Sequence, residues 1–229
     1  NKARRLAQSS ETTVRIGTSL LYKCRLLPDL WTRISEKHPE LKIEILSMTE
    51  YQNRGEVFKA LGIEFDLFEG IYGSTGWDGM CQFLELEHTP ICCAVAKNHR
   101  LAGMKILTMQ DLNGEYLVMP IEGVSKEMDA FRNHIKNNYP TIQIVDSKRY
   151  DLDTFTLCEV NEYILITQPV YADIHNNLVT LPLETNYTLP YGLMYANNPT
   201  SATKKFIRAI TKMETTLFEP QSSVDKYLQ

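Results

Sequence analysis

The sequence predicts an α/β fold with two lobes, and three observations support this prediction. Strand-like and helix-like patterns alternate along most of the 229 residues, which is typical of parallel sheets covered by helices. This alternation occurs in the first half of the chain and is repeated in the second half. No Gly/Ser-rich linker separates the halves, so we expect continuous strands rather than a flexible tether between two lobes of about 100 residues each.

The first half is expected to form a parallel sheet. Residues 14–18 alternate as a strand, and residues 20–37 carry apolar side chains at helical spacing before a His-Pro pair that predicts the helix end. Residues 41–45 alternate between apolar and charged types, which indicates a half-buried strand. A short helix at 56–61 and a strand at 65–72 complete an order that implies right-handed crossovers. The apolar face of the first helix consists of Leu26, Leu27, Leu30, Trp31 and Ile34.

The second half repeats the pattern after two short strands, expected at 83–87 and 90–96 with a tight turn between them. The closing amphipathic helix is expected at 201–213, with its first serine at the N-cap. Residues 2–8 have the basic character of a helix end, and the polar tail at 219–229 is expected to fray. The other expected elements are helices at 109–112, 125–138 and 152–160, and strands at 116–119, 142–147, 163–167, 178–181 and 191–195.

The composition indicates a globular protein and argues against two classes of function. Hydrophobic residues make up 43% of the chain and charged residues 23%, which suits a packed core. The net charge of −4 and the lack of a long basic run argue against an extended phosphate-binding surface in this stretch. No run of apolar residues is long enough to predict a membrane span, and no secretory signal opens the chain.

The cysteines favour a cytosolic protein. The chain has five cysteines, an odd number, and no pair has the CxxC spacing of a zinc site, so we interpret them as reduced thiols. A disulfide is the alternative interpretation. The residues concerned are Cys24, Cys81, Cys92, Cys93 and Cys158.

The usual signatures of catalysis and of metal or cofactor binding are absent from the sequence. It has no GxSxG elbow, no GxxxxGK[ST] loop and no HExxH helix, and no two histidines stand four residues apart. We therefore expect no catalytic residues, no metal and no cofactor. A stretch with Gly70, Gly73, Gly76 and Gly79 lacks the GxGxxG order and leads into no helix, so a loop is expected there.

A polar turn recurs between a strand end and a helix start. In open α/β sheets the ligand crevice lies at the carboxyl ends of the strands, and free backbone N–H groups at helix starts favour anions there. Hydroxyl and amide groups fix the orientation of a ligand without supplying reactive chemistry. The alternative is that each Ser or Thr only caps a helix. The turns are Thr18-Ser19, Ser47-Met48-Thr49, Pro120 to Ser125, and Thr167-Gln168-Pro169.

Glu122 is discordant with an anion pocket, because its carboxylate would repel an acidic ligand. We expect its side chain to point to solvent. Stabilisation of the following helix start, or recognition of an amine on the ligand, are the alternatives.

Six segments of the chain carry a family resemblance: RIGTS, LLPDLWTRISEKHPELKIEI, FDLFEGIY, VAKNHRLAG, ILTMQDLNGEYLVMP and YGLMYANNPTSATKKFIRAI. With these segments the chain resembles the effector-binding domain of LysR-type transcriptional regulators over about residues 2–213. No single segment is diagnostic, but the segments follow one another in the order of that family. One departure is CEVNEYILITQPV, where Asn161-Glu162 stands in place of the glycines that usually precede the strand.

The resemblance implies two Rossmann-like lobes joined by crossover strands, in a fold like that of type II periplasmic binding proteins. It implies lobe I at 13–93 and 183–213 and lobe II at 94–182, with the end of a linker helix at 1–12 and a tail at 214–229. A small metabolite, by default an organic acid or amino acid, would bind in the cleft between the lobes. The implied effector-binding residues are Thr18, Ser19, Leu20, Ser47, Thr49, Pro120, Ile121, Glu122, Gly123, Val124, Ser125, Thr167, Gln168 and Pro169.

The resemblance also implies partners. A winged helix-turn-helix upstream would bind DNA, while this stretch alone would not. A homodimer would form through the Leu26–Lys37 helix and the Leu41–Ser47 strand edge, with a tetramer as an option for the full-length regulator. The competing functions are an exported solute-binding protein, which fits poorly with five cysteines, and an enzyme on a similar scaffold, which would need an acid–base pair in the cleft.

Overall fold

The computed structural model describes residues 11–51, 53–73, 75, 77 and 79–217. The helix end expected at 2–8 and the fraying tail expected at 219–229 lie outside these residues. The described chain forms two compact units. Unit 1 draws on residues 11–72, 77–86 and 191–217, and unit 2 draws on residues 73–75 and 87–190.

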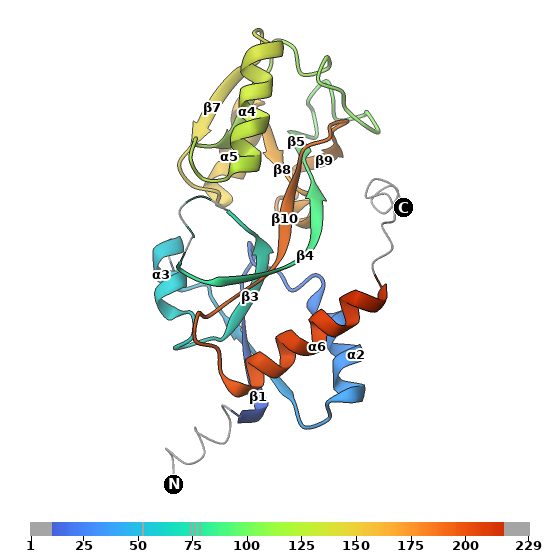
Figure 1. Ribbon diagram of the computed structural model, residues 1–229. Coiled ribbons are helices and arrows are strands. Elements are labelled where there is room, and N and C mark those ends of the chain that lie inside the picture. Colours follow the sequence, from blue (N-terminus) through green and yellow to red (C-terminus); the bar gives the residue numbers. More distant parts are fainter. Residues whose placement is uncertain (1–10, 52, 74, 76, 78, 218–229) are drawn as a thin grey trace. The chain divides into compact units, whose positions relative to one another are not determined.

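The sheet of unit 1 has the strand order β2-β1-β3-β10-β4. β1 pairs in parallel with both β2 and β3, as the strand–helix–strand order predicted, and β10 pairs with β3 in the antiparallel sense. The elements are β1 (Thr13–Thr18), α2 (Leu27–Lys37), β2 (Lys42–Ser47), α3 (Arg54–Ala60), β3 (Leu67–Ile71), β4 (Gln82–Pro90), β10 (Thr188–Tyr195) and α6 (Ser201–Leu217) (Figure 1).

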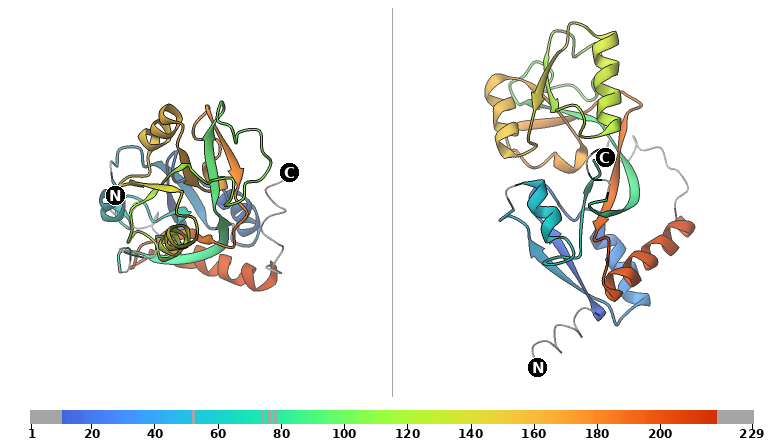
Figure 2. Two further views of the ribbon diagram at one scale, coloured as in Figure 1. Left: turned by 90° about the horizontal axis from the view of Figure 1, so that it is seen from above. Right: turned by 60° about the vertical axis from the view of Figure 1, so that its left-hand side comes forward.

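Helices cover both faces of this sheet. Neighbouring residues of a strand point to opposite faces, so Leu67 and Leu193 pack toward α2 and α6, whereas Phe68 and Met194 pack toward α3. α6 lies beside α2 in the views of Figures 1 and 2, and its Phe206 belongs to the buried core there. The apolar helical face predicted for α2 is confirmed, because its residues belong to or pack against the same core.

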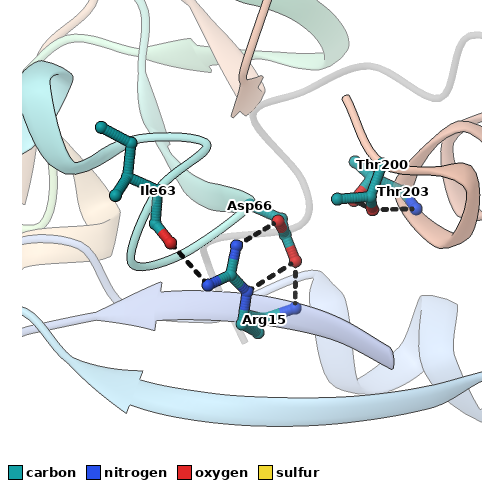
Figure 3. A network of polar contacts seen from close by, with 5 residues as sticks. All are labelled: Arg15, Ile63, Asp66, Thr200 and Thr203. Carbon is teal, nitrogen blue, oxygen red and sulfur yellow. Dashed lines mark hydrogen bonds and ion pairs between the residues drawn. The ribbon is translucent and has the colours of Figure 1, made fainter. Parts of the chain in front are cut away.

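A buried aspartate connects β1 to the chain that enters β3. The Asp66 side chain is almost wholly buried, and its carboxylate accepts hydrogen bonds from the Arg15 backbone N–H at 2.8 Å and from Nη2 at 2.8 Å. Arg15 Nη1 also donates to the Ile63 carbonyl at 2.6 Å (Figure 3). Charge-assisted bonds of this type hold the first and third strands in register.

The sheet of unit 2 has the order β7-β6-β8-β5-β9. β6 pairs in parallel with β7 and β8, whereas β5 pairs in the antiparallel sense with β8 and β9. The predicted α/β class is thereby confirmed in both units. The elements are β5 (Cys92–Ala96), β6 (Tyr116–Pro120), α4 (Lys126–Asn138), β7 (Gln143–Ser147), α5 (Leu152–Asn161), β8 (Ile164–Thr167), the 3-10 turn η1 (Pro169–Tyr171) and β9 (Leu178–Pro182).

Continuous strands carry the chain from one unit to the other, as predicted. The borders between the units fall within β4, after Leu86, and within β10, before Tyr191. A Cβ on Gly192 of β10 would lie 2.0 Å from the Leu84 carbonyl oxygen, so glycine is required where the two strands approach closely. The expected lobe borders at 93 and 182 lie further into unit 2 and stay predictions.

Several local predictions are wrong, each for an identifiable reason. Residues 83–87 and 90–96 form no hairpin, because β4 runs on to Pro90 and β5 joins the other sheet. Residues 109–112 form turns, in which Asp111 accepts from the Thr108 N–H and hydroxyl at 2.7 Å.

Two helix boundaries also differ from the predictions. α2 begins at Leu27, not near residue 20, because the side chains of Thr18 and Ser19 hold the preceding turn through hydrogen bonds to the backbone of Tyr22. At α6 the Thr200 hydroxyl, not that of Ser201, accepts from the Thr203 N–H at 3.2 Å, and the helix continues to Leu217 (Figure 3).

Glu162 shows how the chain ends α5 without the glycines of the resembled family. It adopts φ 55° and ψ 30°, and it is the one non-glycine with positive φ in the part of the chain that the structure describes. Its N–H donates to the Glu159 carbonyl at 3.4 Å, and its carboxylate accepts from Asn98 Nδ2 at 3.2 Å. The helix therefore ends in the left-handed backbone conformation that glycine usually adopts, and this conformation is strained for a glutamate.

The cysteines are free thiols, four of them buried and Cys24 half-buried. Burial raises the pKa of Cys81 to about 11 and that of Cys158 to about 12, so both stay protonated near neutral pH. Among the described residues, no helix is long and apolar enough to span a membrane. Those residues also contain no group of three or more His, Cys, Asp or Glu side chains suited to holding a metal ion.

Candidate ligand-binding site

In unit 1 the structure brings the predicted residues of the first two turns together. Thr18 and Ser47 are register partners at the carboxyl ends of the parallel strands β1 and β2. The Met48 N–H donates to the Thr18 carbonyl at 2.8 Å, so the two turns stay side by side beyond the strands. Ser47 and Thr49 are exposed, and their hydroxyl oxygens lie 2.8 Å apart.

The turn after β1 is closed by its own hydrogen bonds. The Thr18 hydroxyl donates to the Tyr22 carbonyl at 2.9 Å, and the Ser19 hydroxyl accepts from the Tyr22 N–H at 3.3 Å. Leu20 at the tip is 45% exposed. The turn therefore presents one apolar side chain, while its hydroxyl groups already have partners within the chain.

In unit 2 the third predicted turn also lies at the carboxyl edge of parallel strands. Pro120 at the end of β6 is the register partner of Ser147 at the end of β7, and the Ile121 N–H donates to the Ser147 carbonyl at 3.1 Å. β8, which ends at Thr167, runs parallel to β6 on its other side. The turns that follow β6 and β8 thus belong to one edge of the sheet.

The hydroxyl at the end of β8 is buried and paired. Thr167 is wholly buried, and its Oγ1 lies 2.5 Å from the hydroxyl of Tyr150. Burial raises the pKa of Tyr150 well above its usual value, and its ring packs against Phe155 with centroids 5.3 Å apart. Gln168 is also buried, and its carbonyl accepts from the Tyr171 N–H at 3.0 Å.

Ser125 acts as a helix cap, which was the alternative interpretation. Its hydroxyl accepts from the Met128 N–H at 3.3 Å and donates to Glu127 Oε2 at 2.7 Å. In the same turn, Gly123 has φ +90° and donates its N–H to the Asp129 carboxylate at 3.0 Å. These bonds shape the turn before α4 and leave Val124 half-buried within it.

Glu122 points to solvent, as expected. Its side chain is 64% exposed, and Oε2 lies 3.7 Å from Nζ of Lys136, which is also exposed. Its charge is therefore screened by water and partly balanced.

Sequence reasoning missed two residues at this edge of unit 2. Tyr150 was missed because no motif marks it, although it follows a predicted strand closely enough to have been considered. Arg132 of α4 was missed because helical spacing identifies its position as buried but not its partners. Its guanidinium donates to the Pro120 carbonyl and lies 2.7 Å from Asp146, while its Nε has no partner among the described residues.

The starts of α2, α3, α4 and α5 are capped by side chains of the chain itself, so some of the expected free N–H groups already have partners. At α2 the cap comes from Glu69 of β3, whose wholly buried carboxylate accepts from three consecutive backbone N–H groups and from the Tyr191 hydroxyl at 2.6 Å. The backbone donors are Arg25 at 3.0 Å, Leu26 at 2.8 Å and Leu27 at 3.0 Å. Asn53, Ser125 and Asp151 cap α3, α4 and α5.

A separate hollow of about 170 Å³ lies between α2 and α6. Its lining includes Ile34, Ala209 and Met213 together with two lysines and a histidine, and none of the strand-end residues contributes to it. It therefore gives no support to the predicted ligand residues.

The fold of this chain is similar to that of several solved structures. No protein-family model matches the chain, and no curated protein matches it. The effector-binding domain of QuiR, solved in complex with shikimate, is 19% identical with a TM-score of 0.60, and the match covers 91% of this chain and 100% of that one. The BenM effector-binding domain with benzoate is 23% identical with a TM-score of 0.57, covering 92% and 96%.

A third similar structure is CbnR, described as a LysR family transcriptional regulator. It is 15% identical with a TM-score of 0.62, and the match covers 92% of this chain and 73% of CbnR. These neighbours are regulatory proteins or domains, not enzymes. The chain therefore has the two-part α/β fold that effector-binding domains share with a LysR family regulator.

Proposed function

We propose that this chain is the effector-binding domain of a LysR-type transcriptional regulator and acts as a sensor, not as an enzyme. The observation that carries the proposal is the fold, which the QuiR and BenM effector-binding domains share over more than nine-tenths of this chain. The order of the resembling sequence segments supports it independently, since fold alone does not imply function.

The proposed ligand is a small organic acid or amino acid, and the strand-end turns are the residues proposed to bind it. Structural neighbours were solved with shikimate, benzoate and 2-PG. Hydroxyl groups and backbone amides at strand ends orient such ligands without reacting with them. The ligand would shift the population between two arrangements of the domain, to the extent that its affinity differs between them. A DNA-binding domain of the same regulator, at work in the cytoplasm, would respond to that shift.

Ligand binding tests the proposal directly. A thermal-shift screen with amino acids and organic acids, including benzoate and shikimate, is expected to yield at least one ligand whose affinity calorimetry can measure. Thr49→Ala is expected to weaken that affinity about 5–10-fold, because an exposed hydroxyl at the strand ends is lost.

The matched control is Thr156→Ala on α5, whose exposed hydroxyl donates to the Leu152 carbonyl at 3.1 Å away from the strand ends. It is expected to leave the affinity unchanged. A screen in which no acid or amino acid raises the melting temperature would contradict the proposed function.

We also propose a homodimer through the Leu26–Lys37 helix and the Leu41–Ser47 edge. β2 is the edge strand of its sheet, and Ile45 on it is 52% exposed. An exposed apolar side chain on an unpaired strand edge favours association. Light scattering is expected to show a dimer that Ile45→Lys converts to a monomer, whereas Val160→Lys on α5, at a site 73% exposed, leaves it intact. A monomer in the unmodified chain at high concentration would contradict this interface.

A further inference from the structure

Arg54 stands where an acidic ligand of unit 1 would need a positive charge. It is the first residue of α3, the helix that follows β2. A helix that follows a parallel strand begins at the carboxyl edge of the sheet, which is the edge where Thr18 and Ser47 meet. Its side chain is exposed, so a ligand can reach it from solvent.

Two aromatic side chains hold the guanidinium of Arg54. Its Cζ lies 4.8 Å from the centroid of the Trp77 ring, which is a cation–π distance. It also lies close enough to the hydroxyl of Tyr22 that its charge, and a hydrogen-bonding contact, oppose the rise that burial causes in the pKa of Tyr22. Because Tyr22 closes the turn that contains Thr18 and Ser19, the charge is fixed beside that turn.

The charge of Arg54 is not matched by a carboxylate within the described part of the chain. Other arginines there have such partners: Arg15 pairs with Asp66 at 2.8 Å, and Arg132 pairs with Asp146 at 2.7 Å. At the α2 start three N–H groups donate to Glu69, and at the α3 start the Glu56 N–H donates to Asn53, so these N–H groups already have partners. A guanidinium with free donors is well suited to bind a carboxylate.

The surroundings of Arg54 are aromatic. We define the aromatic cluster as Tyr22, Phe58, Phe68, Tyr72 and Trp77. Within this cluster, the centroid of the Trp77 ring lies 5.1 Å from that of Phe58 and 5.4 Å from that of Tyr72. Trp77 is 4% exposed, and its Nε1 has no hydrogen-bond partner among the described residues. A ring-bearing acid would pack on the half-buried rings of this cluster, which are Tyr22, Phe58 and Tyr72.

We propose that Arg54 binds the carboxylate of the effector and that the aromatic cluster favours acids that carry a ring. The inference rests on the proposed function and adds to it the residue that supplies the positive charge. It also resolves the discordance of Glu122, because recognition of the anion is assigned to unit 1 and not to the turn before α4.

Calorimetric titration of benzoate, shikimate, acetate and succinate into the unmodified chain and three variants tests the inference. Arg54→Gln is expected to weaken binding of the ring-bearing acids about 10–100-fold, and Arg54→Lys is expected to restore part of the loss. The control Arg208→Gln, at an exposed arginine of α6, is expected to change affinity less than 2-fold. Because Arg54 is exposed, its variants should melt close to the unmodified chain.

The outcomes separate this inference from the proposed function. If the unmodified chain binds a ring-bearing acid and Arg54→Gln binds it equally well, the role of Arg54 is overturned while the proposed function stands. If acetate or succinate binds as tightly as benzoate and shikimate, the selection of rings is overturned. If a wider screen finds ligands but no acid among them, the anion-binding role of Arg54 is overturned. If the screen finds no ligand of any kind, the proposed function itself is contradicted.

Discussion

The strand-end turns of the two units use hydroxyl groups differently. In unit 1, Ser47 and Thr49 are exposed and contact each other. In unit 2, Thr167 is wholly buried against Tyr150, and Ser125 is 5% exposed and caps α4. A hydroxyl at a strand end is therefore not in itself a ligand group, and in unit 2 these hydroxyls mainly hold the protein in its fold.

The helix starts differ in the same way. The start of α4 is capped by the residue that precedes it, whereas the start of α2 is capped from β3 by Glu69, a residue more than 40 positions away in sequence. The turn before α2 therefore depends on a contact that is distant in sequence, and the turn before α4 depends on its own residues. Variants at these residues are expected to change the free energy of unfolding by different amounts.

The largest effect is expected from Glu69→Gln. The amide can accept at one atom only, so at least one backbone N–H among Arg25, Leu26 and Leu27 loses its partner in a buried position. We expect the free energy of unfolding to fall by about 3 kcal/mol. Urea unfolding measures it, with Tyr191→Phe as the milder comparison at about 1 kcal/mol, because one hydroxyl donor is lost. An unchanged midpoint for Glu69→Gln would show that the cap is unimportant.

The same carboxyl makes stability depend on pH. Burial is the largest cause and raises the pKa of Glu69, while the hydrogen bonds from Tyr191 and the backbone oppose the rise. A raised native pKa favours the protonated folded state, so this contribution is present below about 4.5 and is lost as the pH rises through the native pKa. The difference in unfolding free energy between the unmodified chain and Glu69→Gln should therefore change between pH 4 and 7, with the unmodified chain losing relative stability as pH rises.

Thr167→Val tests whether the buried hydroxyl of unit 2 is structural. Loss of its partner leaves the Tyr150 hydroxyl without this bond, and we expect about 1–2 kcal/mol of destabilisation. Tyr150→Phe should have a similar effect, and the double variant should be less destabilised than the sum of the two. Additive losses would mean that the two hydroxyls do not act as a pair.

Glu162→Gly extends the comparison to the backbone. Just after α3 in unit 1, a positive φ of +83° is taken by Gly62, whereas at the end of α5 in unit 2 a φ of 55° is taken by Glu162. Glycine at residue 162 should raise the free energy of unfolding by about 1 kcal/mol, because the left-handed strain is removed. Glu162→Ala keeps the strain and is the control for loss of the side-chain bond to Asn98. Equal effects of the two variants would refute strain as the cause.

The smallest effect on stability is expected from Ser47→Ala. Its hydroxyl is exposed and can bond to water as well as to Thr49, so we expect a change below about 0.5 kcal/mol. A loss comparable to that of Thr167→Val would remove the distinction between the two units.

Most helices and strands could be predicted from the sequence, because the spacing of apolar residues indicates which face of an element is buried. The alternation at 14–18 and the apolar face of α2 both match the structure. The end of β4 was predicted wrongly, at residue 87, because Thr89-Pro90 has turn-like residues. The strand in fact continues to Pro90, and the next strand, β5, belongs to the other sheet. Ile45 was expected to be buried, but it is exposed because β2 lies at an edge, and sequence alone does not reveal strand order.

The candidate site was predictable only in part. Topology requires that the ends of β1 and β2 meet, so Thr18 and Ser47 could be predicted to lie together. Which hydroxyl is exposed depends on tertiary partners such as Tyr150, and no local pattern encodes those. The same holds for Glu69, whose role depends on α2 starting directly beside β3.

The central claim is that strand-end turns bind a small acid. The most direct measurement is a nuclear magnetic resonance titration of the backbone amides with the tightest acid from the screen. The account predicts that amides of the strand-end turns, with Thr18 and Thr49 among them, shift and saturate with one affinity. Shifts confined to the hollow lined by Ile34 and Met213 would contradict it.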